Sequence, residues 1–177
     1  MLLGRAPECA RIDQLLSDAR EGTSGAAVVV GEPGIGKTAL LRYAVDRAEG
    51  MVVLSAQGVE LEAEVAFSGL LELLRPILHL VDDIPGPQAA ALRGALALGP
   101  TVETDRFIVG AATLSILAAR AEKEPLLAVV DDAHWLDDSS AAALLFAARR
   151  FVADPIVILL AGRAGSNPAL EAAASPS

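Results

Sequence analysis

The stretch Gly31-Glu32-Pro33-Gly34-Ile35-Gly36-Lys37-Thr38 (GEPGIGKT) decides the fold of this 177-residue chain. It satisfies the pattern G-x-x-x-x-G-K-[S/T] in full, which is the pattern of a phosphate-binding P-loop. A short apolar run at 26–30 precedes it, as a buried strand would, and a run with helical spacing follows at 38–49. The sequence therefore predicts a P-loop between a strand and a helix.

Each residue type in this loop has a chemical role. Glycine lets the backbone adopt positive φ and approach an anion, so that successive N–H groups form a nest for phosphate. Lys37 supplies a positive charge for the β- and γ-phosphates, and the Thr38 hydroxyl is suited to bind Mg²⁺. A glycine-rich turn without a ligand is the alternative, but the flanking strand and helix favour a nucleotide site. The predicted nucleotide contacts are Gly31, Glu32, Pro33, Gly34, Ile35, Gly36, Lys37, Thr38 and Ala39.

A second motif, LLAVVDDAHWLDDSS at 126–140, places carboxylates at the end of another apolar run. A P-loop site needs such a carboxylate, borne on a buried strand, to help hold Mg²⁺. Asp131 is the predicted Mg²⁺ partner together with Thr38, and Asp132 stands where many ATPases have a glutamate that orients the attacking water. Because aspartate is one methylene shorter, we expect slow or conditional hydrolysis. The alternative is that the two aspartates only end a strand and begin a turn.

Arg163 closes the last apolar run, IVILLAGR at 156–163. A cation at this point can contact the γ-phosphate and report its loss, so Arg163 is a candidate catalytic residue beside Asp132; a solvated arginine is the alternative. The guanine-specificity motif N-K-x-D is absent, and Asp131 and Asp132 do not begin a D-x-x-G switch. We therefore expect ATP or ADP with Mg²⁺ rather than GTP.

Apolar runs alternate with amphipathic segments along the whole chain. Further strands are expected at 51–55, 126–130 and 156–161, and further helices at 8–20, 66–80, 88–98, 105–122 and 139–150. Pro76 is expected to bend or end its helix, and Thr104 to cap the helix that follows. This alternation favours the α/β class, with a parallel sheet covered on both faces in a three-layer P-loop NTPase sandwich. Residues 1–163 are predicted to form this domain and 164–177 an irregular tail.

Composition and charge narrow the class of protein. Hydrophobic residues make up 53% of the chain, which excludes a disordered tail, and the formal net charge of −9 argues against direct nucleic-acid binding. The longest apolar run, 107–119, is shorter than the roughly 20 residues of a membrane span, and no secretory signal is visible. The single cysteine, Cys9, cannot form an internal disulfide. A cytoplasmic protein without membrane contact is expected.

Several motifs together resemble one family. They are LLGR at 2–5 with Glu8, GEPGIGKTALL at 31–41, AFSGLLELLRPIL at 66–78, DRF at 105–107, the acidic string at 126–140 and AGR at 161–163. In this combination the chain resembles the ATPase domain of large LuxR-type, MalT-like transcriptional regulators. That family belongs to the STAND class and is related to AAA+ and origin-recognition ATPases. The resemblance covers residues 2–163.

The resemblance implies a sheet of order 5-1-4-3-2, counted from the P-loop strand. It also implies a switch, in which ADP holds the regulator closed while ATP and an inducer open it for assembly. Residue by residue, Gly4 and Arg5 match a motif near the adenine, Asp131-Asp132 match the acidic pair, and Arg163 matches the sensor. Ala6 departs from the pattern, because relatives often carry Glu there.

Such regulators continue with a fifth strand, a winged-helix module, sensor repeats and a DNA-binding helix-turn-helix, and none of these fits in 164–177. We therefore expect a fragment or truncated product, whose P-loop strand lies at a sheet edge open to self-association or to full-length relatives. Two interpretations stay open: a weakly hydrolysing, Mg²⁺-dependent ATP switch module, or a non-hydrolysing nucleotide-binding or interaction remnant. A metabolic kinase is a third, but the sequence has no recognisable lid or acceptor site.

Overall fold

The computed structural model describes residues 4–100, 105–151 and 153–163. Within them, one parallel sheet contains the strands β1 (Gly25–Val30), β2 (Val52–Gln57), β3 (Leu126–Asp131) and β4 (Ile156–Gly162). The order across the sheet is β1-β4-β3-β2, so the described part of the chain follows the predicted order 1-4-3-2. The expected α/β class is confirmed, and β1, the P-loop strand, lies at one edge.

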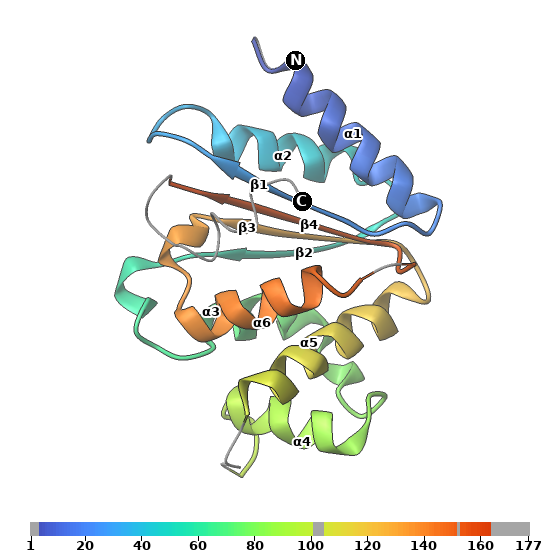
Figure 1. The fold of residues 1–177 in the computed structure, drawn as a ribbon, viewed down its shortest axis with the longest axis vertical. Coiled ribbons are helices and arrows are strands. Elements are labelled where there is room, and N and C mark those ends of the chain that lie inside the picture. Colours follow the sequence, from blue (N-terminus) through green and yellow to red (C-terminus); the bar gives the residue numbers. More distant parts are fainter. Residues whose placement is uncertain (1–3, 101–104, 152, 164–177) are drawn as a thin grey trace.

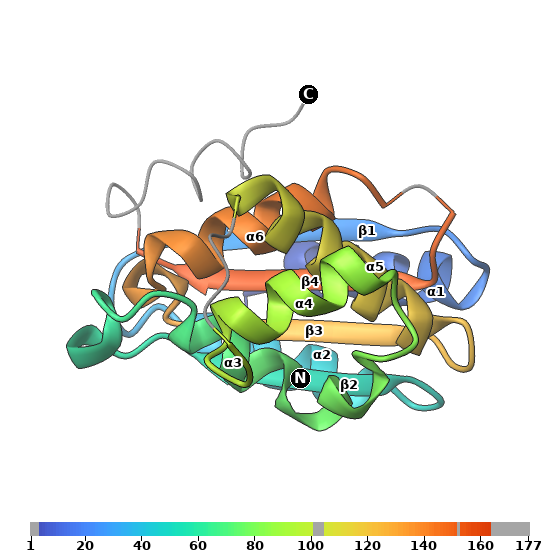
Figure 2. The ribbon, with the colours of Figure 1, turned by 90° about the horizontal axis from the view of Figure 1, so that it is seen from below.

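Helices cover both faces of this sheet (Figure 1). On one face lie α1 (Ala6–Arg20) and α2 (Lys37–Arg47). On the other lie α3 (Ser68–Leu74), α5 (Arg106–Ala121) and α6 (Asp138–Ala148), with α4 (Gly86–Ala95) outside α5 (Figure 2). Short 3-10 helices occur at Glu60–Glu62 (η1), Arg75–Leu80 (η2) and Ala133–Trp135 (η3). The long insert between β2 and β3 thus holds three α-helices, as predicted.

The two central strands explain the aliphatic composition. Side chains alternate along a strand, so successive residues of β3 and β4 enter opposite layers of the core. Leu126, Ala128 and Val130 pack with α3 to α6, whereas Leu127 and Val129 pack with α1 and α2. Every residue of β4 is buried. Strands buried on both faces need continuous apolar runs, which is why these two were recognisable in the sequence.

Three predicted boundaries can be compared with the structure. The regular helix ends at Leu74, and Pro76 lies in the 3-10 helix η2, as expected for a proline. The predicted cap Thr104 is wrong: Asp105 caps α5, because its carboxylate accepts the Phe107 N–H at 2.9 Å. Thr104 itself and the predicted tail 164–177 lie outside the described residues. The strand β2 continues to Gln57, two residues beyond its predicted end.

Because the strands are parallel, the carboxyl ends of all four lie on the same side of the sheet, on the left in Figure 1. Val30 is level with Gly162, and Gln57 is level with Asp131. The segments that follow these strands therefore meet: the P-loop, the acidic turn, Arg163 and the loop after β2. Ligands of open α/β sheets bind at such carboxyl ends. Among the described residues, no helix is long and apolar enough to cross a membrane.

Candidate functional site

The P-loop has the backbone geometry of an anion nest. Gly34 and Gly36 adopt φ of +79° and +93°, which side-chain-bearing residues rarely adopt, and Gly36 is the N-cap of α2. Lys37 is buried and donates from Nζ to the carbonyl oxygens of Gly31 and Glu32, at 2.9 and 3.0 Å. Carbonyl groups of the loop itself thus hold the ammonium group of Lys37. A phosphate group can replace these carbonyl oxygens as the acceptor of the lysine.

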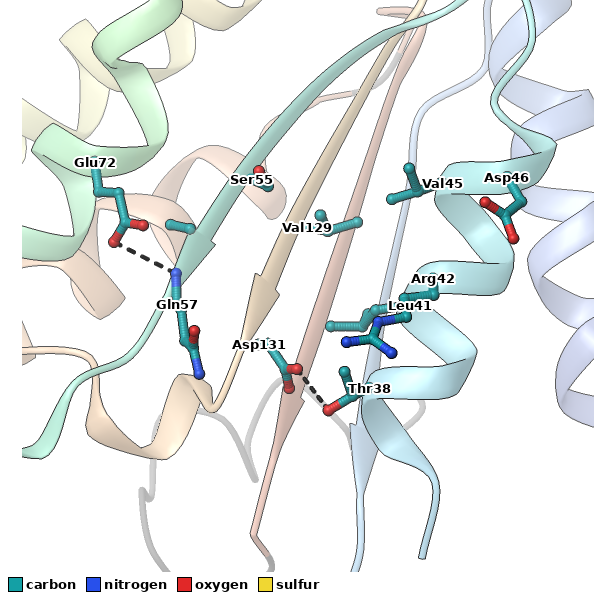
Figure 3. Close-up of a pocket in the computed structure, with 11 residues that line it drawn as sticks. Thr38, Leu41, Arg42, Val45, Asp46, Ser55, Gln57, Glu72, Val129 and Asp131 are labelled. Atoms are coloured by element: carbon teal, nitrogen blue, oxygen red, sulfur yellow. Dashed lines mark hydrogen bonds between the residues drawn. The ribbon is translucent and has the colours of Figure 1, made fainter. Parts of the chain in front are cut away.

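The predicted Mg²⁺ pair lies beside this lysine. The Thr38 hydroxyl donates to Asp131 Oδ2 at 2.6 Å, so residues 93 positions apart meet at one point (Figure 3). Both groups offer the oxygen donors that Mg²⁺ prefers. Within the described residues no cluster of three or more His, Cys, Asp or Glu could hold a metal ion. The Thr38 hydroxyl and the Asp131 carboxylate fit Mg²⁺, which keeps several waters and takes its other ligands from phosphate.

Asp132 has a strained backbone that is fixed from several sides. Its φ is +46°, in the left-handed region, and its carbonyl accepts the Trp135 N–H at 2.8 Å. Its own N–H donates to Asp131 Oδ1 at 2.9 Å. The side chain of Gln57 donates to Asp132 Oδ2 at 3.4 Å. Gln57 is a functional candidate that the sequence did not suggest, because its strand was predicted to end before it.

Gly58 explains why β2 can approach the acidic turn so closely. Its N–H donates to the Asp131 carbonyl at 2.9 Å, and a Cβ at this position would come within 2.2 Å of the Asp132 carbonyl oxygen. No larger residue fits without moving one of the two backbones. Glycine is required here because a side chain has no room, and not because the backbone adopts a positive φ. A lone glycine after a strand gave no sequence signal of this kind.

Asp137 connects the acidic string to the start of α3. Its carboxylate caps α6 by accepting the Ser140 N–H at 2.9 Å, and it also accepts the Phe67 N–H at 2.8 Å. The Ser140 hydroxyl accepts the Leu70 N–H at 2.8 Å. Asp137 and Ser140 are both buried. The segments 66–78 and 126–140 are therefore parts of one structural unit.

His134 lies in η3, two residues after Asp132, and is buried. Neither ring nitrogen has a hydrogen-bond partner within the described part of the chain, and Nδ1 is 3.9 Å from Asp132 Oδ1. Burial lowers the pKa of this imidazole, Asp132 opposes that effect, and the charges of Arg163 and Lys37 add to it. His134 is therefore neutral at pH 7, and its proximity to Asp132 is not an ion pair at that pH.

A hollow of about 400 Å³ opens over the P-loop. It brings together the predicted residues Lys37, Asp132 and Arg163, with Arg42 as an addition. Arg42 lies four residues after Thr38, on the same face of α2, and this helical spacing was the available signal. The residues that line this hollow are Pro33, Gly34, Gly36, Lys37, Thr38, Ala39, Arg42, Asp132 and Arg163.

The N-terminal motif, Gly4 and Arg5, contacts the P-loop through the side chain of Arg5. Arg5 donates from Nη2 to the Ile35 carbonyl at 2.6 Å, while Gly4 adopts a φ of +74° with no atom close to its Cβ position. Arg5 lines a separate hollow with α1 and β1 rather than the one over Lys37. Its contact with the base thus stays a prediction, as does that of Gly4.

The chain belongs to the AAA ATPase domain family, whose model matches residues 1–159. This family implies the use of a nucleotide and typically Mg²⁺. The structure of Cdc6p from Pyrobaculum aerophilum is similar, with a TM-score of 0.63 and 18% identity over 99% of this chain and 44% of that one. A Walker-type ATPase of Pyrococcus abyssi has a TM-score of 0.48 and 16% identity over 91% of this chain and 45% of that one. No curated protein matches the sequence.

These comparisons bear on the family resemblance. Membership of the AAA ATPase family confirms the expected kinship with AAA-type ATPases, and the likeness to Cdc6p supports the P-loop NTPase fold. This chain spans less than half the length of either solved structure. The LuxR-type regulator stays a prediction.

Proposed function

We propose that this AAA ATPase domain binds ATP with Mg²⁺ at the P-loop and hydrolyses it slowly, as the switch module of a LuxR-type regulator. The observation that carries the proposal is the 2.6 Å hydrogen bond between Thr38 and Asp131, directly beside the buried Lys37. A hydroxyl and a carboxylate meet there, and the residue before Thr38 carries an ammonium group. Such a set suits a metal–phosphate complex.

Each residue has a defined task in this proposal. Thr38 and Asp131 would hold Mg²⁺, which would supply positive charge where negative charge develops during phosphoryl transfer. Lys37 would bind the phosphates, and Thr38 would ligate the ion directly with Asp131 acting through water. Asp132 would orient the attacking water, and Arg163, which lines the same hollow, would contact the γ-phosphate. Arg163 would thus sense whether ATP or ADP is bound.

The regulator role is supported by the motifs at 66–78 and 126–140. These two segments contact each other through Asp137, so the resemblance concerns a single unit rather than scattered matches. Asp132 in place of glutamate favours a long-lived ATP state. A slow ATPase suits a switch better than a motor, because the bound nucleotide defines the state for longer.

A non-hydrolysing nucleotide-binding module is the second candidate. The specific observation in its favour is that the Asp132 carboxylate accepts a hydrogen bond from Gln57 and belongs to a short side chain. A carboxylate held in this way would reach an attacking water less readily. Binding would then be retained without turnover.

Phosphate release from ATP by the purified chain separates the two candidates. We expect slow, Mg²⁺-dependent release, which Asp132→Asn lowers by about 100-fold, the usual contribution of a positioned acid–base group, without changing ADP affinity. Asp138→Asn is the matched control, because Asp138 is exposed on α6, and it should leave the rate unchanged. Release at the level of the buffer blank, with ATP bound, would favour the second candidate.

A further inference from the structure

The segment between β2 and α3 exposes apolar side chains beside the nucleotide site. Its sequence, VELEAEV at 59–65, alternates apolar and acidic residues as a half-buried strand does, yet it forms the 3-10 helix η1 and turns. Val59 is 41% exposed, Leu61 92% and Val65 54%. In Figures 1 and 2 the segment stands out from the body of the domain. Such a local conflict between pattern and structure marks a functional surface.

The segment is ordered despite this exposure. The Glu62 N–H donates to the Val59 carbonyl at 2.9 Å, and the Val65 N–H donates to the Glu62 carbonyl at 2.8 Å. The Phe67 N–H is held by buried Asp137. A partner would therefore meet a preformed surface and would not have to order the loop, which favours affinity.

A hollow of about 550 Å³ lies beside the exposed side chains. Val59, Val65 and Leu71 supply its apolar lining, and Glu62, Glu72 and Arg75 supply its charges. The hollow can hold an apolar side chain and place a neighbouring cation against a carboxylate. A purely apolar partner would bring no positive charge to these carboxylates.

The charge of this surface is strongly one-sided. Four glutamates, Glu60, Glu62, Glu64 and Glu72, stand against one cation, Arg75. In the part of the chain that the structure describes, none of these five forms an ion pair. From this complementarity we propose that residues 59–75 form a docking surface for a basic segment of a partner protein, in which Lys or Arg alternates with large apolar residues.

The docking surface adjoins the nucleotide site, and Glu72 is the residue that connects them. Glu72 lines both the docking hollow and the hollow next to Thr38 and Asp131, and its carboxylate accepts the Gln57 N–H at 3.4 Å (Figure 3). The side chains changed in the docking test, Leu61, Glu62 and Val65, line neither hollow at the nucleotide site, so the docking test does not depend on ATP binding. A failed nucleotide titration would leave this proposal standing, and the reverse also holds.

A fluorescent peptide in which Lys and Leu alternate is the probe, titrated with the nucleotide-free chain and read by anisotropy. We expect it to bind more tightly than a peptide of alternating Lys and Gly or of alternating Glu and Leu. The double variant Leu61→Ser/Val65→Ser should weaken binding by about tenfold or more, and Glu62→Lys should do the same. All these side chains are exposed, so the variants should melt as the wild type does.

Two matched controls make the result specific. Leu98→Ser removes an exposed leucine outside the docking surface, and Glu49→Lys reverses an exposed charge just after the C-terminal end of α2. Both should bind the peptide as the wild type does. Equal weakening by the controls would overturn the proposal in favour of general attraction to an acidic protein. Equal binding of all three peptides, or self-association abolished by Leu61→Ser/Val65→Ser, would overturn it as well.

Discussion

The P-loop at 31–38 and the acidic turn at 131–137 form one site but are held in different ways. The P-loop is stabilised mainly by its own residues, through Gly34, Gly36 and the contacts of Lys37 with carbonyls five and six positions earlier, with a hydrogen bond from the distant Arg5 to the Ile35 carbonyl in addition. The acidic turn depends on Gly58, Gln57 and the amide of Phe67, far away in the sequence. A short motif can therefore specify the phosphate-binding half, whereas the fold must assemble the Mg²⁺ and water-orienting half.

Among substitutions that disrupt the long-range contacts of the acidic turn, we expect Gly58→Ala to lower the free energy of unfolding most. A Cβ there would lie 2.2 Å from the Asp132 carbonyl oxygen, so one backbone must move. We predict a loss of about 3 kcal/mol in the free energy of unfolding, measured by urea titration. Gly86→Ala is the control, because no atom lies within 4 Å of that Cβ position, and it should be close to neutral. Similar losses in both variants would mean that the close approach is unimportant.

A somewhat smaller loss is expected for Asp137→Ala. The substitution removes the acceptor of the Phe67 N–H and also of the Gly69 N–H in α3 and the Ser140 N–H in α6, so the starts of both helices lose a cap. We predict about 2 kcal/mol less stability in the same urea assay. Asp138→Ala, at the exposed neighbouring position, should cost less than about 0.5 kcal/mol. If the two variants unfold alike, Asp137 does not connect the segments as described.

The smallest effect concerns His134 and pH. Burial lowers its pKa in the folded chain, so below the ordinary imidazole pKa of about 6.5 the unfolded chain binds more protons. Stability should therefore fall as pH drops through the range below about 6.5, and His134→Gln should remove that part of the decline. Urea titrations at pH 7 and pH 5.5 measure the difference. Parallel pH dependences of wild type and variant would contradict this role.

The sequence predicted the central strands, the position of the P-loop between a strand and a helix, and the position of Asp131 at the end of a strand. Each of these follows from a continuous apolar run or a strict local pattern. It missed the end of β2, because an edge strand alternates buried and exposed residues and its final Gln57 is polar. Gln57 was therefore not expected beside Asp132. Thr104 and Asp105 are both good capping residues, and only the backbone geometry selects Asp105.

The second role of Asp137 was beyond sequence reasoning for a related reason. Its capping of α6 follows from its position before a helix, which is a local signal. Its hydrogen bond with the Phe67 N–H joins residues 70 positions apart and depends on how α3 packs against α6. Gly58 is similar, since its importance lies in an atom of Asp132 that the sequence does not place nearby.

Calorimetric titration of the purified chain with ATP and Mg²⁺ tests the central claim most directly. Lys37 and Lys123 are the only lysines in the sequence, and Lys123 is exposed, so Lys123→Ala is a matched control for Lys37→Ala. We predict saturable binding by the wild type and by Lys123→Ala, weakened at least about 30-fold in Lys37→Ala because a charged phosphate contact is lost. Equal affinities of Lys37→Ala and the wild type would contradict the assignment of the P-loop as the nucleotide site.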